Sequence, residues 1–427
     1  MRKIFSTVVA TLALVACSQL PSLRQDTPAS HSSSVERQVA QRGDGALWVT
    51  LTLPYPNLHT EGVAPGPDGN MWFTRVGPQS SGVIGKMNMS GVFTEYPYEG
   101  TPGLITAGSD GAMWFTEPRT IGRITMAGII TQYHIPYNRA TPTGITNGPD
   151  GNVWFADIDK PFIAKITPLG VITYYFIPKP NPRCPYGITS GPDGNIWYTD
   201  FCANKIGRVT PDGKFTLFTV PTPGSGPQGI VTGADGNLYF TEYLVYPAKL
   251  AQITPSGTIT QYILPLADNH PVYIVKASSG DSLWILDENQ THTDTQLREF
   301  DIHSKKFTTL VAPPAGANIS SMDVGPDGNL WFGDYFGPVQ VFVTHVLTSN
   351  PASLVFPGIG QSQTIKIHET RYAGGSFTAQ TSDPSIATVS PGNRSNSFVV
   401  VSQGVGSCAI HVNDSLGNSI DVSVTVQ

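Results

Sequence analysis

Residues 184–221 read CPYGITSGPDGNIWYTDFCANKIGRVTPDGKFTLFTVP and hold four short runs of β-forming residues. The runs cover 185–190, 196–200, 205–210 and 214–220. The Asp-Gly pairs before the second and fourth runs tolerate the positive φ that hairpin turns need. We therefore expect a four-stranded antiparallel meander, a sheet that cannot bury both of its faces alone.

The same unit recurs along the chain, and the recurrence predicts the architecture. An aromatic anchor stands in the second run of each unit at intervals of 42, 40, 43, 42, 45 and 47 residues, within or near the period of propeller blades. We expect an all-β fold whose main part is a seven-bladed β-propeller, since a closed ring leaves no long exposed sheet edge. The anchors are Trp72, Trp114, Trp154, Trp197, Tyr239, Trp284 and Trp331.

The last unit predicts how the ring closes. It shows only three runs, near 319–324, 329–333 and 339–344. Residues 46–54 (ALWVTLTLP) resemble a fourth run without the other three. We expect this N-terminal strand to complete the seventh blade.

The N-terminus has the features of an export signal. A basic head precedes an apolar run that is short for a membrane span, and it ends Leu14-Val15-Ala16-Cys17, which resembles a bacterial lipobox. The resemblance implies an exported, envelope protein anchored by lipid on Cys17, at the outer membrane if the host has one. The alternative is a plain secretory signal in residues 1–17 with a chance cysteine. Residues 18–44 are polar and predict a disordered tether to a propeller over residues 45–345.

A second domain is expected over residues 346–427. The aromatic repeat stops there, and seven short β runs follow in about 80 residues. Residues 382–389 (SDPSIATV) resemble the signature region of bacterial Ig-like domains. We expect an Ig-like β-sandwich that acts as a spacer.

The net charge limits the kinds of partner to expect, and the cysteines indicate a disulfide. The net charge is −6 and no basic run occurs, so nucleic acid is not an expected partner. Contact with a membrane is expected only through the lipid anchor, and the protein is expected to be a monomer. Cys184 and Cys202 flank the first two runs of one blade at the same end, and an exported compartment permits a disulfide between them.

The repeat motif resembles that of a known family. The pattern P-x-G-I-T-x-G-P-D-G-N-x-W-F-T-[E/D], followed by I-G-R-[I/V]-T, occurs here at residues 142–146, 112–117 and 121–125 among others. It resembles the virginiamycin B lyase (streptogramin lyase) family along the whole propeller. The resemblance implies a seven-bladed propeller that opens a cyclic ester by elimination, with a histidine as general base and Mg²⁺ stabilising the developing enolate.

The position x of P-x-G-I is where the resemblance places the histidines, in the last two blades. Val272 and Ser320 stand there instead, and neither can abstract a proton as an imidazole does. His270, two residues before Val272, is the candidate displaced base. The seven x positions are Glu61, Gly103, Thr143, Tyr186, Gln228, Val272 and Ser320, and all of them except Gly103 are expected to line a central funnel.

Acidic residues occur three positions after six of the seven anchors. We expect them to ring the mouth of the funnel. The resemblance points to Asp287, Glu288 and Asp334, in the last two blades, as ligands for a cation such as Mg²⁺. The alternative is structural, with each acid paired to a repeat base such as Arg123, Lys205 or Arg208, or solvated. The six acids are Glu117, Asp157, Asp200, Glu242, Asp287 and Asp334.

Two functions remain open from the sequence. The first is a carbon–oxygen lyase acting on a cyclic, ester-linked substrate. The second is a non-catalytic propeller whose funnel, lined by aromatic residues such as Tyr186, Tyr243 and Tyr335, binds a small molecule or a surface glycan or peptide. A histidine close to the acids would favour the lyase, and an aromatic funnel without one would favour binding.

Overall fold

The computed structural model describes residues 31–34, 36–41, 47–53, 57–89, 91–179, 183–265, 270–288, 295–309, 313, 317–335, 339–343, 347–369, 377–414 and 419–427. Apart from one 3₁₀ turn, η1 (Pro78–Ser80), the secondary structure of this part is β-strand. Cys17 and the predicted signal segment lie outside the described residues. Within them, we find no helix with the length and apolar character needed to cross a membrane.

The sheet around Trp197 forms as the sequence predicts. Its strands pair in chain order as an antiparallel meander, with Trp197 opposite Thr189 and Arg208. The turn between the first two strands places Gly194 at φ 72°, a conformation that residues other than glycine seldom adopt. The strands are β16 (Pro185–Ser190), β17 (Ile196–Asp200), β18 (Lys205–Val209) and β19 (Phe215–Thr219).

Six further sheets of the same type belong to the propeller. In chain order their strands are β4 (His59–Pro65), β5 (Met71–Val76), β6 (Ser81–Met87) and β7 (Val92–Glu99); β8 (Ile105–Ala107), β9 (Met113–Glu117), β10 (Thr120–Ile124) and β11 (Ile130–His134); β12 (Pro142–Asn147), β13 (Val153–Asp157), β14 (Phe162–Ile166) and β15 (Ile172–Phe176); β20 (Pro227–Thr232), β21 (Leu238–Glu242), β22 (Lys249–Ile253) and β23 (Ile259–Ile263); β24 (His270–Lys276), β25 (Ser282–Glu288), β26 (Thr295–Asp301) and β27 (Lys306–Thr309); β28 (Ile319–Val324), β29 (Leu330–Asp334) and β30 (Val339–Val343).

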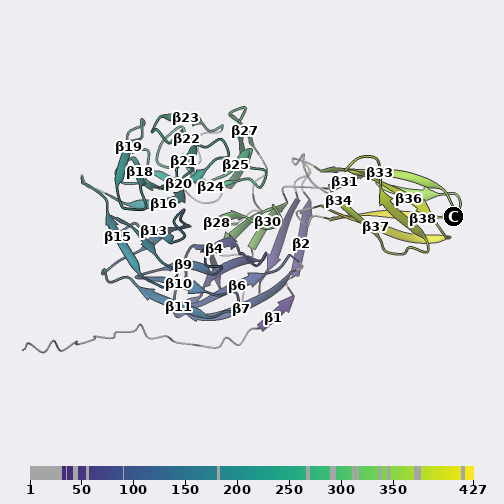
Figure 1. Ribbon diagram of the computed structural model, residues 1–427, viewed down its shortest axis with the longest axis horizontal. Coiled ribbons are helices and arrows are strands. Elements are labelled where there is room, and N and C mark those ends of the chain that lie inside the picture. The colour runs from purple at the N-terminus through teal and green to yellow at the C-terminus, as the bar shows by residue number, and fades with distance from the viewer. Residues whose placement is uncertain are drawn as a thin grey trace, which may run out of the picture.

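The innermost strands of these blades form a closed ring (Figure 1). Contacts run in order through β4, β8, β12, β16, β20, β24 and β28, and β28 returns to β4. The cores lie between blades: Trp72 of the first blade packs with Ile105 and Phe115 of the second. Each blade therefore buries the face that its own sheet leaves open, which accounts for the fully buried tryptophan anchors.

The N-terminal strand closes the ring as predicted. β3 (Leu47–Thr52) pairs antiparallel with β30 and becomes the fourth strand of the seventh blade. Trp48, Leu51 and Leu53 are buried there.

The predicted tether differs from the structure in part. β1 (His31–Ser34) pairs with β7 at the edge of the first blade, and β2 (Glu36–Gln41) pairs with β3 at the edge of the seventh. An outer strand exposes unpaired N–H and C=O groups, which accept another strand through the main chain alone. A polar sequence without apolar periodicity can therefore still become an edge strand.

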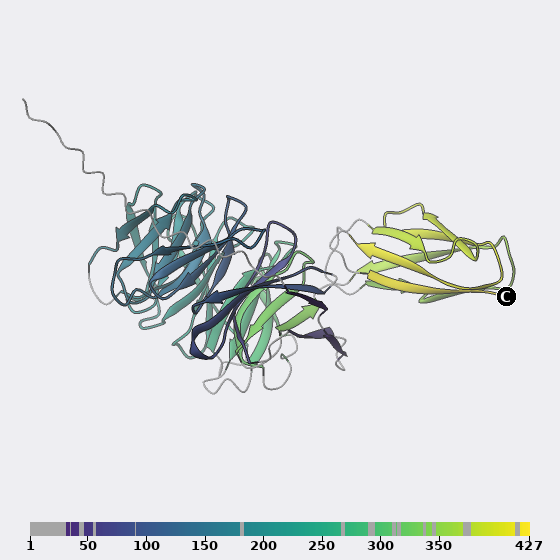
Figure 2. The same cartoon turned by 90° about the horizontal axis from the view of Figure 1, so that it is seen from below.

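The C-terminal strands form a separate pair of sheets beside the propeller (Figure 2). Among the described residues they pair only with one another, and side chains of both sheets share one core that includes Phe356, Phe398 and Val424. The seven expected runs are all strands, and one further strand, β31, precedes them. These strands are β31 (Leu347–Asn350), β32 (Ser353–Phe356), β33 (Ser362–Glu369), β34 (Phe377–Thr381), β35 (Ala387–Pro391), β36 (Ser397–Ser402), β37 (Gly406–Asp414) and β38 (Ser419–Val426).

Candidate functional site

The glycine of P-x-G-I lets neighbouring inner strands approach closely. A Cβ atom on Gly187 would lie 2.3 Å from the carbonyl oxygen of Gln228 in the next blade, and one on Gly144 would lie 2.4 Å from that of Tyr186. The threonine two positions after the anchor completes the joint. In the fourth blade Gly187 N–H donates to Thr199 Oγ1 at 2.9 Å, and the Thr199 hydroxyl donates to Gln228 O at 2.7 Å.

The sixth blade departs from this arrangement. Tyr273 occupies the glycine position and Leu286 the threonine position, and the two are paired across β24 and β25. The Tyr273 hydroxyl donates to the carbonyl oxygen of Ser320 in the seventh blade at 2.5 Å. A phenol ring thus makes the joint to the next blade that glycine and threonine make in the fourth blade.

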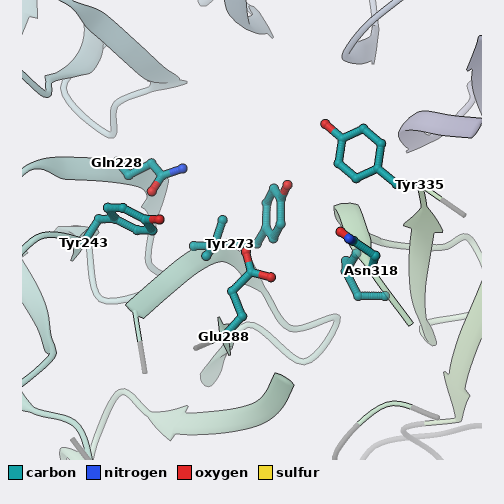
Figure 3. A pocket seen from close by; sticks show the side chains of 8 residues that line it. Gln228, Tyr243, Tyr273, Glu288, Asn318 and Tyr335 are labelled. Atoms are coloured by element: carbon teal, nitrogen blue, oxygen red, sulfur yellow. The ribbon is translucent and has the colours of Figure 1, made fainter. Parts of the chain in front are cut away.

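A cavity of about 430 Å³ lies at this altered joint. In Figure 3, Tyr243 and Gln228 line one side of it, and Tyr335 and Asn318 line the other. Its volume falls in the range of pockets for small molecules. The full lining consists of Gln228, Tyr243, Val272, Tyr273, Glu288, Asn318, Ile319 and Tyr335.

Carboxylates give this cavity a negative character. Glu288 lines it and is 5% exposed. Glu61 is hydrogen-bonded to the hydroxyl of Tyr335, and burial raises the pKa of Glu61. Burial, together with the charge of Glu61, raises the pKa of Tyr335 to about 12. Burial and the charge of Glu288 also raise the pKa of Tyr243.

The predicted funnel positions divide into two groups. Gln228 and Val272 line the cavity, while Glu61 and Tyr186 act electrostatically on its tyrosines. Thr143 and Ser320 serve the joints between blades. The hydroxyl of Thr143 contacts the carbonyl oxygens of Pro185 and Tyr186, and the buried Ser320 hydroxyl donates to Thr60 O.

His270 lies close to the cavity without lining it. Its Nδ1 is 2.5 Å from the carbonyl oxygen of Tyr243, and the two rings have centroids 5.0 Å apart. A carbonyl oxygen only accepts, so Nδ1 carries a proton, and in a neutral imidazole the lone pair that a general base needs is then on Nε2. His270 is also paired with Glu288 across β24 and β25.

The six acids after the anchors lie at or next to the ends of the second strands of their blades. Five are buried, and the structure uses them to hold loops and strands. Asp200 accepts hydrogen bonds from the N–H groups of Cys184 and Ala203 at 2.9 and 3.3 Å. Asp287 forms a two-point ion pair with Arg298, 2.8 Å for each bond. A polar side chain at a strand end has loop amides within reach, and burial makes it bond to them.

The other acids follow the same pattern. Glu117 accepts from Thr101 N–H at 3.1 Å, Glu242 from the Gln261 amide at 2.5 Å, and Asp334 from Asn318 N–H at 3.4 Å. Asp157 accepts from Asp159 N–H at 3.1 Å. The repeat bases expected as alternative partners pair elsewhere, Arg123 with Asp110 and Arg208 with Asp193. Among the described residues, no group of three or more His, Cys, Asp or Glu could hold a metal ion.

Cys184 and Cys202 form a disulfide, with Cα atoms 5.3 Å apart. It joins the residue before β16 to the loop after β17. The bond lies at the end of the fourth blade where Asp200 holds the same loop.

The sequence reasoning missed Tyr273, Asn318 and Ile319 as lining residues. The signal for Tyr273 was present, because the sixth unit reads Pro271-Val272-Tyr273-Ile274 where the motif requires glycine. Asn318 precedes the seventh inner strand and carries no motif that marks it.

Fold and cavity together define a seven-bladed propeller with a ligand-sized pocket at the joint of its last two blades. The model of the virginiamycin B lyase family matches residues 41–209 and 163–311. The chain belongs to that family.

Solved structures agree with this assignment. A streptogramin B lyase is 26% identical over 69% of this chain and 97% of its own, with a TM-score of 0.62. A catalytically inactive histidine-to-alanine variant of virginiamycin B lyase from Staphylococcus aureus, with quinupristin, is 28% identical over 73% of this chain and 99% of its own, also at 0.62. The WD40 propeller domain of Doa1, at 12% identity over 67% of this chain and 93% of its own and a TM-score of 0.53, shares the fold alone. A search of the curated proteins gives no match.

Proposed function

We propose that this propeller is a binding protein whose cavity holds a small cyclic or aromatic molecule without turning it over. One observation carries the proposal: Val272, at the position where the resemblance places a catalytic histidine, presents hydrocarbon to the cavity. Ser320, at the other such position, has its hydroxyl bonded to Thr60 O and does not line the cavity. The cavity therefore has side chains that can bind a ligand, but other residues replace the two expected catalytic bases.

A second candidate function is a carbon–oxygen lyase acting on a cyclic ester. His270 favours it, since its Nδ1–H is fixed on Tyr243 O and its Nε2 is available as a base. The family resemblance also implies Mg²⁺. The described residues supply no cluster of three metal ligands, so we derive no step through a metal ion.

The experiment uses the chain without its first 17 residues, incubated with quinupristin with and without Mg²⁺. Binding is measured by calorimetry, and products are separated by chromatography before mass spectrometry, because elimination leaves the mass unchanged. We expect binding without turnover. Turnover at an ordinary enzymatic rate, about 1–10³ per second, that is lost in His270→Ala would establish the lyase instead.

We further propose the placement of the protein. The apolar run before Cys17 supports export and a lipid anchor. In this proposal a tether follows over part of residues 18–44, the propeller spans residues 45–345, and the protein is a monomer. The independent pairing of β31–β38 supports an Ig-like spacer over 346–427. Incorporation of labelled palmitate that disappears in Cys17→Ala tests the anchor, and its persistence in that variant would contradict it.

A further inference from the structure

Two side-chain amides face the cavity at the joint of the last two blades from opposite walls (Figure 3). Gln228 lies on the inner strand of the fifth blade, and Asn318 precedes the inner strand of the seventh. The Oε1 atom of Gln228 is buried and has no hydrogen-bond partner. A buried acceptor of this kind costs free energy until a donor reaches it.

Backbone hydrogen bonds hold two walls of the cavity in place. Asn318 N–H donates to Asp334 Oδ1 at 3.4 Å, and Asn318 O accepts from Tyr335 N–H at 2.8 Å. On the other side, Tyr243 N–H donates to Gly226 O at 3.1 Å. These bonds leave the Asn318 amide and the Tyr243 hydroxyl to meet a ligand, and they reduce the conformational freedom that binding would cost.

The other polar groups of the lining have partners within the chain. Tyr273 gives its proton to Ser320 O, and Tyr335 is hydrogen-bonded to Glu61. Glu288 also has an interaction within the chain, so no ligand charge follows from it. These three lining residues therefore do not specify the ligand.

The groups that remain for a ligand are neutral, and each of them both donates and accepts hydrogen bonds. They are the amides of Gln228 and Asn318 and the hydroxyl of Tyr243. Between them the lining is apolar, with Val272, Ile319 and the tyrosine rings. A matching ligand therefore carries neutral groups that donate and accept at its edge, and hydrocarbon on its face. A sugar ring has both, because its hydroxyl groups lie around the edge and its C–H groups form the face.

We propose that the cavity recognises a neutral sugar ring, either a free sugar or the end of a glycan. A hydroxyl group of the ring donates to Gln228 Oε1, and others exchange hydrogen bonds with the Asn318 amide and the Tyr243 hydroxyl. The C–H face of the ring packs on the tyrosine rings and Val272. The inference rests on the proposed binding function and narrows its small cyclic ligand to one chemical class.

The test compares glucose, galactose and N-acetylglucosamine with cyclohexanol, a ring that carries a single hydroxyl group. Titration calorimetry on the chain without its first 17 residues should show at least one sugar binding about tenfold tighter than cyclohexanol, which corresponds to about 1.4 kcal/mol. Gln228→Met and Asn318→Leu remove an amide at nearly constant shape, so each should weaken that sugar severalfold and leave cyclohexanol unchanged. Asp212→Asn changes a carboxylate that is 66% exposed in a distant turn and should have no effect. Melting curves verify that each variant is folded.

The linear trimer of the sugar that binds separates the two sources. A trimer that binds at least as tightly as the single sugar indicates the end of a glycan. A trimer that the cavity excludes indicates a free sugar.

Quinupristin separates this inference from the function on which it rests. If quinupristin binds and none of the three sugars does, the cavity is a binding site and the inference is wrong. Binding of a sugar that survives both Gln228→Met and Asn318→Leu also overturns it, as does an equal loss of sugar and cyclohexanol in these variants. If neither quinupristin nor any of the sugars binds to folded protein, the proposed function itself fails.

Discussion

Tyr273 is the residue that distinguishes the sixth blade from its neighbours. In the first, third, fourth and fifth blades a glycine stands at this position, and Gly187 leaves room there for the carbonyl of Gln228 in the next blade. Tyr273 instead reaches the corresponding carbonyl, that of Ser320, with its hydroxyl. The bond satisfies an acceptor on a buried residue, and the cavity lies beside the same ring.

Removal of this hydroxyl should destabilise the propeller. Tyr273→Phe leaves the Ser320 carbonyl without its donor, so we expect a loss of about 1–2 kcal/mol in the free energy of unfolding. Urea denaturation measures it. The matched control is Tyr174→Phe, because the buried Tyr174 hydroxyl has no hydrogen-bond partner and its removal should be neutral or stabilising. Equal losses in the two variants would contradict the assigned role of Tyr273.

Single residues also show where sequence reasoning about the site reached its limit. Gln228 and Val272 could be assigned to the cavity because the repeat fixes their place on inner strands. The acids after the anchors could not be interpreted in the same way, since a carboxylate at a strand end serves a loop amide as well as a ligand. Only the fold shows that Asp200 bonds to Cys184 N–H and that Asp287 is paired with Arg298.

At the scale of elements, the blades were predictable because one motif sets both turn and packing. In the fourth blade Asp193 makes the turn and accepts the Trp197 Nε1–H bond at 2.9 Å, while Arg208 lies 5.4 Å from the Trp197 ring centroid. Each blade can therefore be recognised in the sequence from its side chains. β1 and β2 could not be predicted, since strands that join an edge through main-chain bonds leave no such pattern.

The disulfide of the fourth blade should stabilise the element that carries it. Cys184 and Cys202 are separated by 18 residues, and closing a loop of this length contributes about 3 kcal/mol by restricting the unfolded chain. We expect the Cys184→Ser, Cys202→Ser double variant to melt at a lower temperature. A reductant should lower the melting temperature of the parent protein and leave that of the double variant unchanged. A reductant effect of equal size in both proteins would show that the bond contributes nothing.

At the scale of the whole molecule, two sets of carboxyl groups have opposite effects on how the stability of the fold depends on pH. Burial raises the pKa of Asp157 to about 6 and that of Asp323 to about 7, so the folded state binds protons there that the unfolded state has already released. Stability should therefore fall as pH rises from about 4 to about 7. In the turn acids, burial alone would raise the pKa, but hydrogen bonds from tryptophan or tyrosine and from neighbouring amides outweigh it and lower the pKa. The stability that these acids contribute to the folded state is lost only as pH falls below their ordinary pKa of 3.8. These are Asp68, Asp110, Asp150, Asp193 and Asp235.

The melting temperature should thus be highest in mildly acidic solution and fall by several degrees towards pH 8. Scanning calorimetry from pH 4 to 8 measures the profile. Asp157→Asn should flatten it, because that variant has no carboxyl group at position 157 to ionise. A melting temperature that climbs steadily from pH 4 to 8 would contradict the assignment of these two buried acids.

The ring as a whole depends on the strand that returns from the N-terminus. β3 covers β30 and buries Trp48, Leu51 and Leu53, with the Trp48 ring 5.3 Å from Phe332 and 5.0 Å from Phe342. Burial of a large apolar side chain contributes about 1.5–3 kcal/mol. Three such side chains approach the total stability of a typical domain, about 5–15 kcal/mol. A chain that begins at residue 54 should therefore melt far below one that begins at residue 45, or fail to fold.

The chain beginning at residue 45 is the control, since it lacks β1 and β2 but keeps β3. Its melting temperature should lie close to that of the chain without its first 17 residues, because β1 and β2 add only outer edge strands to complete blades. A synthetic peptide of residues 45–54 should raise the melting temperature of the chain that begins at 54 in proportion to its concentration, since binding to the folded state alone stabilises that state. If the two truncated chains melt within about 2 °C of each other, β3 is one more edge strand, and the contacts between β28 and β4 alone hold the ring closed.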